Sequence, residues 1–92
     1  MAASASILDV EDLRAVFGRR IRELRDRAKL SQEQLAERAD LHWTYVSEVE
    51  RGRRGPSLDV VGRLALGLRV SPAELFATLK GRYRPRRRMR PS

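Results

Sequence analysis

The chain of 92 residues contains no cysteine and a single histidine, His42. Without cysteine there is neither a disulfide framework nor a thiolate for catalysis. One histidine without a second histidine or a cysteine does not make a zinc site, so we expect no metal. The sequence also lacks a glycine-rich phosphate loop, and its carboxylates are scattered among arginines at helical spacing. We therefore expect no cofactor and no enzymatic activity.

Long apolar runs are also missing. No stretch approaches the roughly 20 apolar residues that cross a bilayer. The N-terminal residues MAASAS have neither the basic region nor the apolar run of a signal peptide. Together with the lack of cysteine, these features favour a cytoplasmic protein. The length allows one small domain with a modest core.

The positive charge is unevenly distributed along the chain. There are 20 Lys and Arg against 12 Asp and Glu, which gives a net charge of +8. Seven of the cations follow Leu79, so the preceding residues, with 13 cations and all 12 anions, are nearly neutral. We expect 81–92 to be a disordered Arg-rich tail that either solubilises the protein or binds DNA phosphates without sequence preference.

Apolar residues recur at helical spacing in five segments, and no strand pattern of useful length is present. This predicts an all-α fold of five helices over 9–80, preceded by a disordered segment over 1–8. The first helix is expected from Asp9 to about Lys29. Ser57 is a predicted N-cap of the fourth helix. Ser71, followed by Pro72 and Glu74, is the predicted start of the fifth, which Gly81 ends.

The stretch from Ser31 to Gly52, SQEQLAERADLHWTYVSEVERG, has the pattern of a helix-turn-helix. Ser31 and Gln34 form a predicted capping box at the start of its first helix. Asp40 tolerates the positive φ that the turn requires. The second helix is expected from about His42 to Arg51, with Gly52 as the residue that ends it. Its one-sided apolar pattern leaves a polar face for the DNA major groove.

Three segments together resemble the Cro and phage-repressor (XRE) family of DNA-binding regulators. They are LSQEQLAERA, TYVSEVERG and PSLDVVGRLALGLRVSPAELF, and the resemblance extends from about Phe17 to Phe76. The same segments are similar to those of restriction–modification controller proteins. Two positions depart from the family pattern: Asp40 replaces the usual turn glycine, and Trp43 replaces a polar or basic residue. The resemblance implies a compact five-helix bundle of the phage-repressor type that binds DNA, in a protein encoded by a bacterium or a phage.

The polar face of the second helix supplies the candidate DNA contacts. We predict base readout by side chains in its first turns, with Trp43 either an apolar flank or a packing residue at the helix junction. We predict phosphate contacts from the start of the bracing helix and from the residues after the recognition helix. Tyr45 is either mostly core or a phosphate contact. The base-reading candidates are Trp43, Thr44, Ser47 and Glu48. The phosphate-contacting candidates are Gln32, His42, Tyr45, Arg51, Arg53 and Arg54.

The family resemblance further implies a partly buried ion pair between Arg25 and Glu50. We expect a homodimer on a pseudo-palindromic double-stranded DNA operator, with the fifth helix at the interface. Leu75 and Leu79 are the interface candidates, and Phe76 is divided between core and interface. The predicted function is sequence-specific transcription regulation. The alternative is an adaptor or antitoxin-like protein that binds a protein partner through its helices and nucleic acid through its tail.

Overall fold

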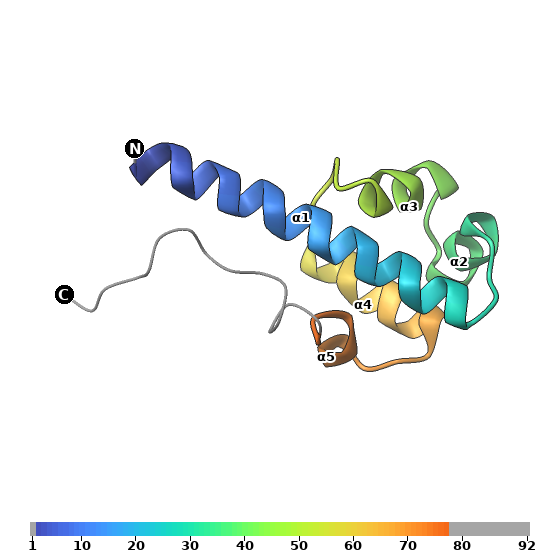
Figure 1. Ribbon diagram of the computed structural model, residues 1–92. Coiled ribbons are helices and arrows are strands. Elements are labelled where there is room, and N and C mark those ends of the chain that lie inside the picture. Colours follow the sequence, from blue (N-terminus) through green and yellow to red (C-terminus); the bar gives the residue numbers. More distant parts are fainter. Residues whose placement is uncertain (1, 78–92) are drawn as a thin grey trace.

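The computed structural model describes residues 2–77, with side chains from 13 onward. Within these residues the secondary structure is helical, as predicted, and no strand is present. Helix α1 crosses the smaller helices, and its N-terminal turns extend beyond them (Figure 1). The helices are α1 Ala2–Arg27, α2 Gln32–Ala39, α3 Trp43–Glu50, α4 Leu58–Leu68 and α5 Pro72–Leu75.

Helix α1 begins at Ala2, so the helix starts earlier than the expected Asp9, and the disorder expected over 1–8 is not found at residues 2–8. The first residues are mainly alanine and serine, without glycine or proline. Alanine is the strongest helix former, and extending an existing helix costs far less than nucleating one. The helix that packs from Leu13 onward can therefore continue toward the N-terminus. The other expected boundary, at 80 and 81, lies outside the described residues.

The start of α2 and the turn that follows it have the predicted local structure. The Ser31 hydroxyl accepts from the Gln34 N–H, and the Gln34 side chain accepts from the Ser31 N–H, which completes the capping box. Asp40 has φ 57° and lies in the left-handed region. Arg63 of α4 donates to the Asp40 carbonyl at 3.0 Å. The capping box thus fixes the start of α2, and the bond from Arg63 of α4 holds the turn that follows α2.

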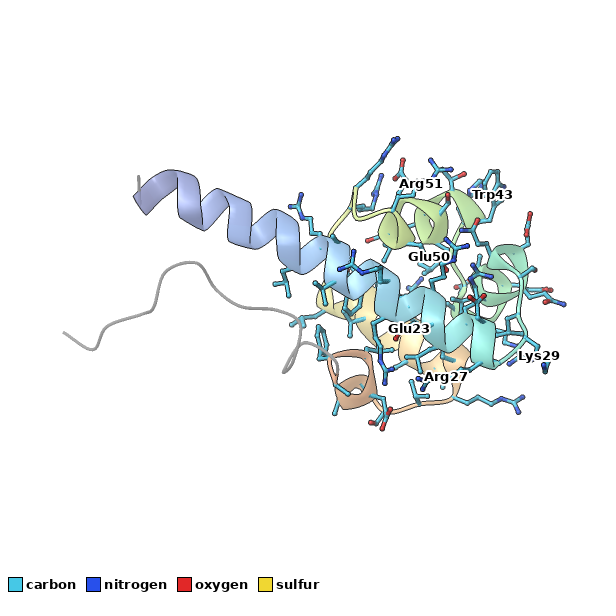
Figure 2. All side chains as sticks on the ribbon, viewed as in Figure 1. Glu23, Arg27, Lys29, Trp43, Glu50 and Arg51 are labelled. Carbon is cyan, nitrogen blue, oxygen red and sulfur yellow. The ribbon has the colours of Figure 1, made fainter. Side chains whose placement is uncertain are left out.

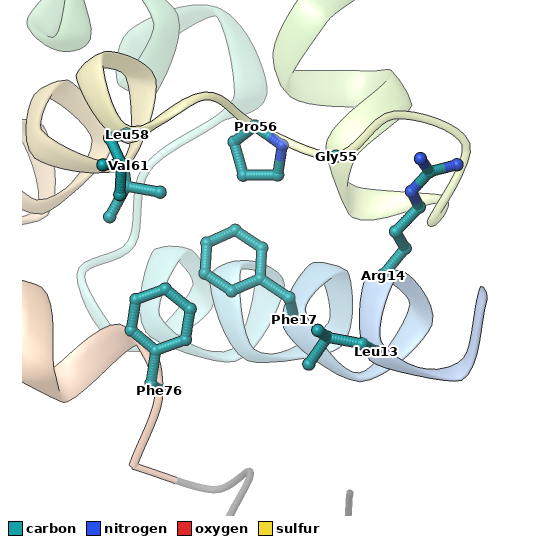
Figure 3. Close-up of a pocket in the computed structure, with 8 residues that line it drawn as sticks. All are labelled: Leu13, Arg14, Phe17, Gly55, Pro56, Leu58, Val61 and Phe76. Carbon is teal, nitrogen blue, oxygen red and sulfur yellow. The ribbon is translucent and has the colours of Figure 1, made fainter. Parts of the chain in front are cut away.

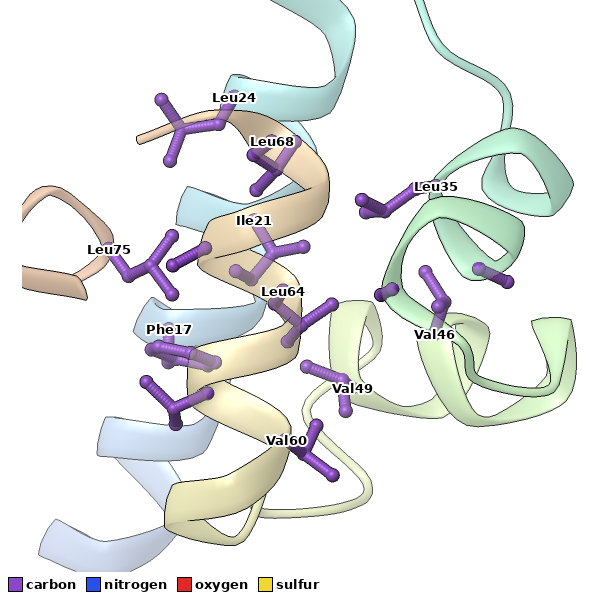
Figure 4. Packing of buried hydrophobic residues seen from close by; sticks show 14 of the residues in the cluster. Phe17, Ile21, Leu24, Leu35, Val46, Val49, Val60, Leu64, Leu68 and Leu75 are labelled. Atoms are coloured by element: carbon purple, nitrogen blue, oxygen red, sulfur yellow. The ribbon is translucent and has the colours of Figure 1, made fainter. Parts of the chain in front are cut away.

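The core lies where all five helices meet (Figure 4). Its fully buried side chains include Ile21 from α1, Leu35 from α2 and Leu64 from α4. Helix α1 approaches α3 very closely, because a Cβ added at Gly18 would lie 2.3 Å from the Val49 carbonyl oxygen. This contact requires glycine and sets the distance between α1 and the end of α3. The remaining core residues are Phe17, Leu24, Leu30, Ala36, Ala39, Val46, Val49, Val60, Val61, Ala65, Leu68 and Leu75.

Helix α5 is shorter than expected and ends at Leu75, so its predicted end at Gly81 is wrong. Leu75 is completely buried and is therefore core, which corrects its assignment to the dimer interface. Phe76 is 40% exposed, and its ring centroid lies 5.1 Å from that of Phe17. Leu79 lies outside the described residues. The interface candidate that stays available in the described chain is Phe76.

The Arg20 side chain holds α5 in place, although this helix has only four residues. Its side chain is buried and donates from Nε to the Glu74 carbonyl at 3.0 Å and from Nη2 to the Glu74 carboxylate at 3.2 Å. The Glu74 carboxylate thus accepts a hydrogen bond from α1. One turn of helix is not stable alone, and these bonds together with buried Leu75 supply the missing stabilisation.

Candidate nucleic-acid interface

Helix α3 turns a wide arc of its surface toward the protein. Val46 and Val49 are buried at the centre of the fold, and Glu50 lies next to Val46 around the helix axis, on the side away from Val49. With about 100° per residue, Thr44 and Glu48 fall on the opposite side. Figure 2 shows α3 at the edge of the molecule, with Trp43 at its first turn and Arg51 at its end. The outward face is therefore available to a partner over its whole length.

Ser47 does not belong to this outward face, although the sequence predicted it there as a base reader. Its residue exposure is only 4%. Helix α3 packs against both α1 and α2, so its buried arc is wider than the apolar stripe alone indicates. Serine is small enough to be enclosed at the border of that arc. The prediction for Ser47 is wrong, because a side chain covered by protein cannot reach a base edge.

The first turn of α3 is capped by His42. Its Nδ1 accepts a hydrogen bond from the Thr44 N–H at 3.1 Å. The imidazole stacks against the Trp43 indole with 6.0 Å between ring centroids. Trp43 nevertheless remains 48% exposed. The capped start of the helix thus presents a large aromatic surface beside the Thr44 side chain.

Glu50 is the residue through which α3 is fixed to the rest of the fold. The Arg25 Nε donates to Glu50 Oε2 at 2.6 Å, and its Nη2 donates to Oε1 at 3.0 Å. Gln32 donates to the same Oε1 at 3.0 Å, and Arg25 also donates to the Leu30 carbonyl at 2.8 Å. The hydrogen bond to Glu50 raises the pKa of Arg25 above its usual value. These contacts join α1, the start of α2 and the end of α3.

The Glu50 contact also bears on Gln32 itself, a predicted phosphate contact. One of the two N–H groups of its amide is directed to Glu50. The side chain is only partly exposed, at the first residue of α2. A phosphate at this place would therefore meet the backbone N–H groups of the first turn of α2 together with the remaining amide hydrogen.

Three side chains form a second cluster on the outward side of α3, which we name the Arg54 cluster: Tyr45, Glu48 and Arg54. The Arg54 Nε donates to Glu48 Oε1 at 2.8 Å. The Arg54 guanidinium carbon lies 4.6 Å from the centre of the Tyr45 ring, a cation–π contact. Tyr45 is half-buried and packs against the core. Two predicted DNA contacts, Glu48 and Arg54, are thus bound to each other in the free protein.

The loop after α3 carries three exposed arginines close together. Gly52 has φ +75° and turns the chain back, and the Arg53 N–H donates to the Glu48 carbonyl at 2.9 Å. Arg51 and Arg53 are exposed, and the side chain of neither forms an ion pair within residues 13–77. This basic edge continues the polar face of α3, which suits contact with a polyanion.

Sequence reasoning missed two contacts, one on this surface and one between α1 and α5. The Glu48–Arg54 contact joins residues six apart across a glycine turn, a spacing with no helical signature. The burial of Arg20 also had no signal, because its partner is more than fifty residues away.

Among the described residues there is no cluster of histidine and carboxylate side chains that could hold a metal ion. The helices described over 2–77 are too short or too polar to cross a membrane.

Comparison with known proteins agrees with this geometry. Residues 16–79 match a family model described as a helix-turn-helix domain. Control protein C.BamHI of Bacillus amyloliquefaciens is 42% identical over 66 residues, which are 71% of this chain and 82% of that protein. Control protein C.MunI of a Mycoplasma species is 35% identical over 72 residues, covering 77% of this chain and 97% of that protein.

Solved structures show the same relationship. The restriction–modification controller protein C.AhdI from Aeromonas hydrophila has a TM-score of 0.68 and 48% identity, over 68% of this chain and 96% of that one. The described fold, the capped α2–α3 unit and these relatives lead to one assignment. The chain belongs to the helix-turn-helix family of DNA-binding transcriptional regulators.

Proposed function

We propose that the protein binds a specific double-stranded DNA operator as a homodimer, with α3 in the major groove. The observation that carries this proposal is the fixation of α3 through Glu50, which Arg25 and Gln32 hold from two other helices. A recognition helix must keep its outward side chains in a constant position to discriminate bases. The Glu50 contacts fix the helix from behind and leave Thr44 and Glu48 on its free side.

Base readout is assigned to the outward residues of the first turns of α3. Glu48, when ionised, has only acceptors, and its natural base partner is the N4 amino group of cytosine. Thr44 offers a hydroxyl to several bases or its methyl group to thymine, so its preference should be weaker. Trp43, half exposed at the entrance of the helix, supports an apolar flank. His42 is assigned to the cap, and through it to the position of Thr44.

Phosphate contacts are assigned to the two ends of the α2–α3 unit. The N-terminus of α2 presents N–H groups and the positive end of a helix dipole beside Gln32. Arg51, Arg53 and Arg54 follow α3 on the other side. Tyr45 contributes mainly as the surface beneath Arg54. Contacts at both ends would position α3 along the groove without themselves reading the sequence.

A homodimer would place two copies of α3 about 34 Å apart on successive major grooves. Because Leu75 is buried, the interface has to be built from other residues. An apolar cleft with a volume of about 240 Å³ opens between α1, the start of α4 and Phe76 (Figure 3). Leu58 at its rim is 89% exposed. We assign this cleft, with Phe76 and Leu58, to the contact between two copies.

Selection of bound sites from a random DNA pool tests the proposed function. We expect a pseudo-palindromic consensus whose two halves are about one helical turn apart. The preference should survive rising salt, whereas purely electrostatic binding would weaken for all sequences alike. Recovery of no consensus would contradict the proposal. The relatives, which are controller proteins and other helix-turn-helix regulators, favour this function over an adaptor, and such a regulator would act in the bacterial cytoplasm.

A further inference from the structure

We propose that Arg54 is a positioning residue for base reading, which acts by holding the Glu48 carboxylate. It would do so in addition to meeting a phosphate. This inference rests on the proposed function, in which Glu48 accepts from the N4 group of a cytosine. It makes Tyr45, Glu48 and Arg54 one recognition unit rather than three separate contacts.

The contacts in the Arg54 cluster divide the functional atoms between protein and partner. Arg54 uses Nε for Glu48 Oε1, and within residues 13–77 its two η nitrogens make no hydrogen bond. Glu48 uses Oε1 for Arg54, and Oε2 makes no hydrogen bond in the same part of the chain. Glu48 is 35% exposed and Arg54 50% exposed, counted over their side chains. One oxygen thus remains for a base, and the η nitrogens remain for a phosphate.

The position of the guanidinium is set from two directions. The Tyr45 ring packs against the core and supports the flat face of Arg54. The backbone bond from the Arg53 N–H to the Glu48 carbonyl draws the loop back over α3. Gly52 starts this turn. A Cβ added at Gly52 would lie 3.1 Å from the Ala15 Cα, so the path of the loop is confined. Arg54 is therefore held near Glu48 by more than their charges.

Electrostatics explains why Glu48 needs such a partner. A carboxylate placed in the DNA groove is repelled by the phosphates on both sides, which weakens binding to every sequence. An arginine on one oxygen cancels this charge locally and also fixes the plane of the carboxylate. A lysine carries the same charge but lacks the flat, forked donor group that can bond Glu48, stack on Tyr45 and meet a phosphate together. Arg54→Lys therefore keeps the positive charge but removes the group that fixes the position of the Glu48 carboxylate.

The test compares four variants with the wild-type protein on DNA sites that differ at the base pair read by Glu48. The variants are Arg54→Lys, Arg54→Ala, Glu48→Ala and the double variant Glu48→Ala/Arg54→Lys. Arg53→Ala is the matched control, because it removes a neighbouring arginine whose side chain forms no ion pair within residues 13–77. Affinity is measured for each site over a range of salt concentrations, and melting temperatures verify folding.

We expect Arg54→Lys to reduce discrimination at this base pair by at least about fivefold while keeping the salt slope of the wild type. Arg54→Ala should lose the same discrimination and lower the salt slope by about one unit. The double variant should lose no more discrimination than Glu48→Ala. Arg53→Ala should weaken binding to all sites equally. In the free protein, Arg54→Lys should also move the Tyr45 ring resonances in an NMR spectrum.

Two results would overturn the inference while leaving the proposed function intact. Arg54→Lys could keep full base discrimination, which would make Arg54 a phosphate contact only. Glu48→Ala could leave the preference unchanged, and then there would be no reading for Arg54 to support. A wild-type protein without any site preference would contradict the proposed function and this inference together. The site preference of the wild-type protein therefore distinguishes failure of this inference from failure of the proposed function.

Discussion

Arg25 and Glu50 form a bidentate ion pair that joins the end of α1 to the end of α3. The two bonds measure 2.6 and 3.0 Å, and the side chains are only 12% and 4% exposed. The planar guanidinium meets both carboxylate oxygens, a geometry that lysine cannot reproduce. Because α3 carries the proposed base-reading residues, this pair connects the stability of the fold to the position of the recognition surface.

Removing one partner of this pair should be strongly destabilising. We expect Glu50→Ala to lower the free energy of unfolding by about 3–5 kcal/mol, because Arg25 would keep a buried charge without its partner. Urea unfolding measures this change. The exposed pair of Arg63 and Asp59, at 3.2 Å on α4, is the control. Asp59→Ala should cost about 1 kcal/mol or less, and a Glu50 variant with equally small loss would show that the Arg25 pair contributes little.

Two glycines should respond to alanine in opposite ways. At Gly18 an added Cβ would meet the Val49 carbonyl oxygen at 2.3 Å, so α1 and α3 would have to move apart. We expect Gly18→Ala to destabilise the protein by about 1–3 kcal/mol. Gly62 in α4 has no atom within 4 Å of the added Cβ. Gly62→Ala should stabilise by about 0.5–1 kcal/mol, since alanine favours the helix.

Thermal melting of the two glycine variants compares them directly. A destabilised Gly18→Ala protein should also bind DNA less specifically, because α3 would no longer have a fixed position. If both variants melted at the wild-type temperature, the close contact between α1 and α3 would not limit stability.

Thr44 and Ser47 should separate DNA binding from folding. Thr44 is exposed, so Thr44→Ala should leave the free energy of unfolding within about 0.5 kcal/mol of the wild type and weaken operator discrimination. Ser47 is 4% exposed, so a bulky Ser47→Leu has no room and should destabilise by about 1–3 kcal/mol. Operator affinity and melting are measured for both. A stable Ser47→Leu protein with altered base preference would return Ser47 to the DNA-contacting face.

Features that depend on neighbouring residues were predictable from the sequence. The capping box of Ser31 and Gln34 and the left-handed turn at Asp40 need only local chemistry, and both are present. The partners Arg25 and Glu50 came from the family resemblance, because residues 25 positions apart have no local signal. The match from 16 to 79 contains the five core-forming segments, which explains why the fold class was accessible.

The remaining features depend on how elements pack. Ser47 is polar and lies beside an exposed face, and it is buried only because α1 and α2 both cover α3. Leu75 fits an interface as well as a core, and Arg20 and the neighbouring core decide between them. The Glu48–Arg54 contact requires the chain to reverse at Gly52. Each of these depends on a distance between segments that periodicity cannot supply.

The proposed dimer contact predicts a different effect for two exposed leucines of α4. Leu58 is 89% exposed at the rim of the apolar cleft, and Leu66 is 75% exposed but does not line it. Because Leu58 loses little contact with its own core, Leu58→Gln should fold normally and weaken self-association by tenfold or more, equivalent to about 1.4 kcal/mol. Leu66→Gln should leave association unchanged.

Sedimentation velocity over a concentration series, without DNA, measures the dimer directly. Loss of association should also shorten the DNA footprint to one half-site, since a monomer has a single recognition helix. If the wild type remained a monomer at high micromolar concentration, or if Leu66→Gln had the larger effect, the cleft would not be the contact between the two copies.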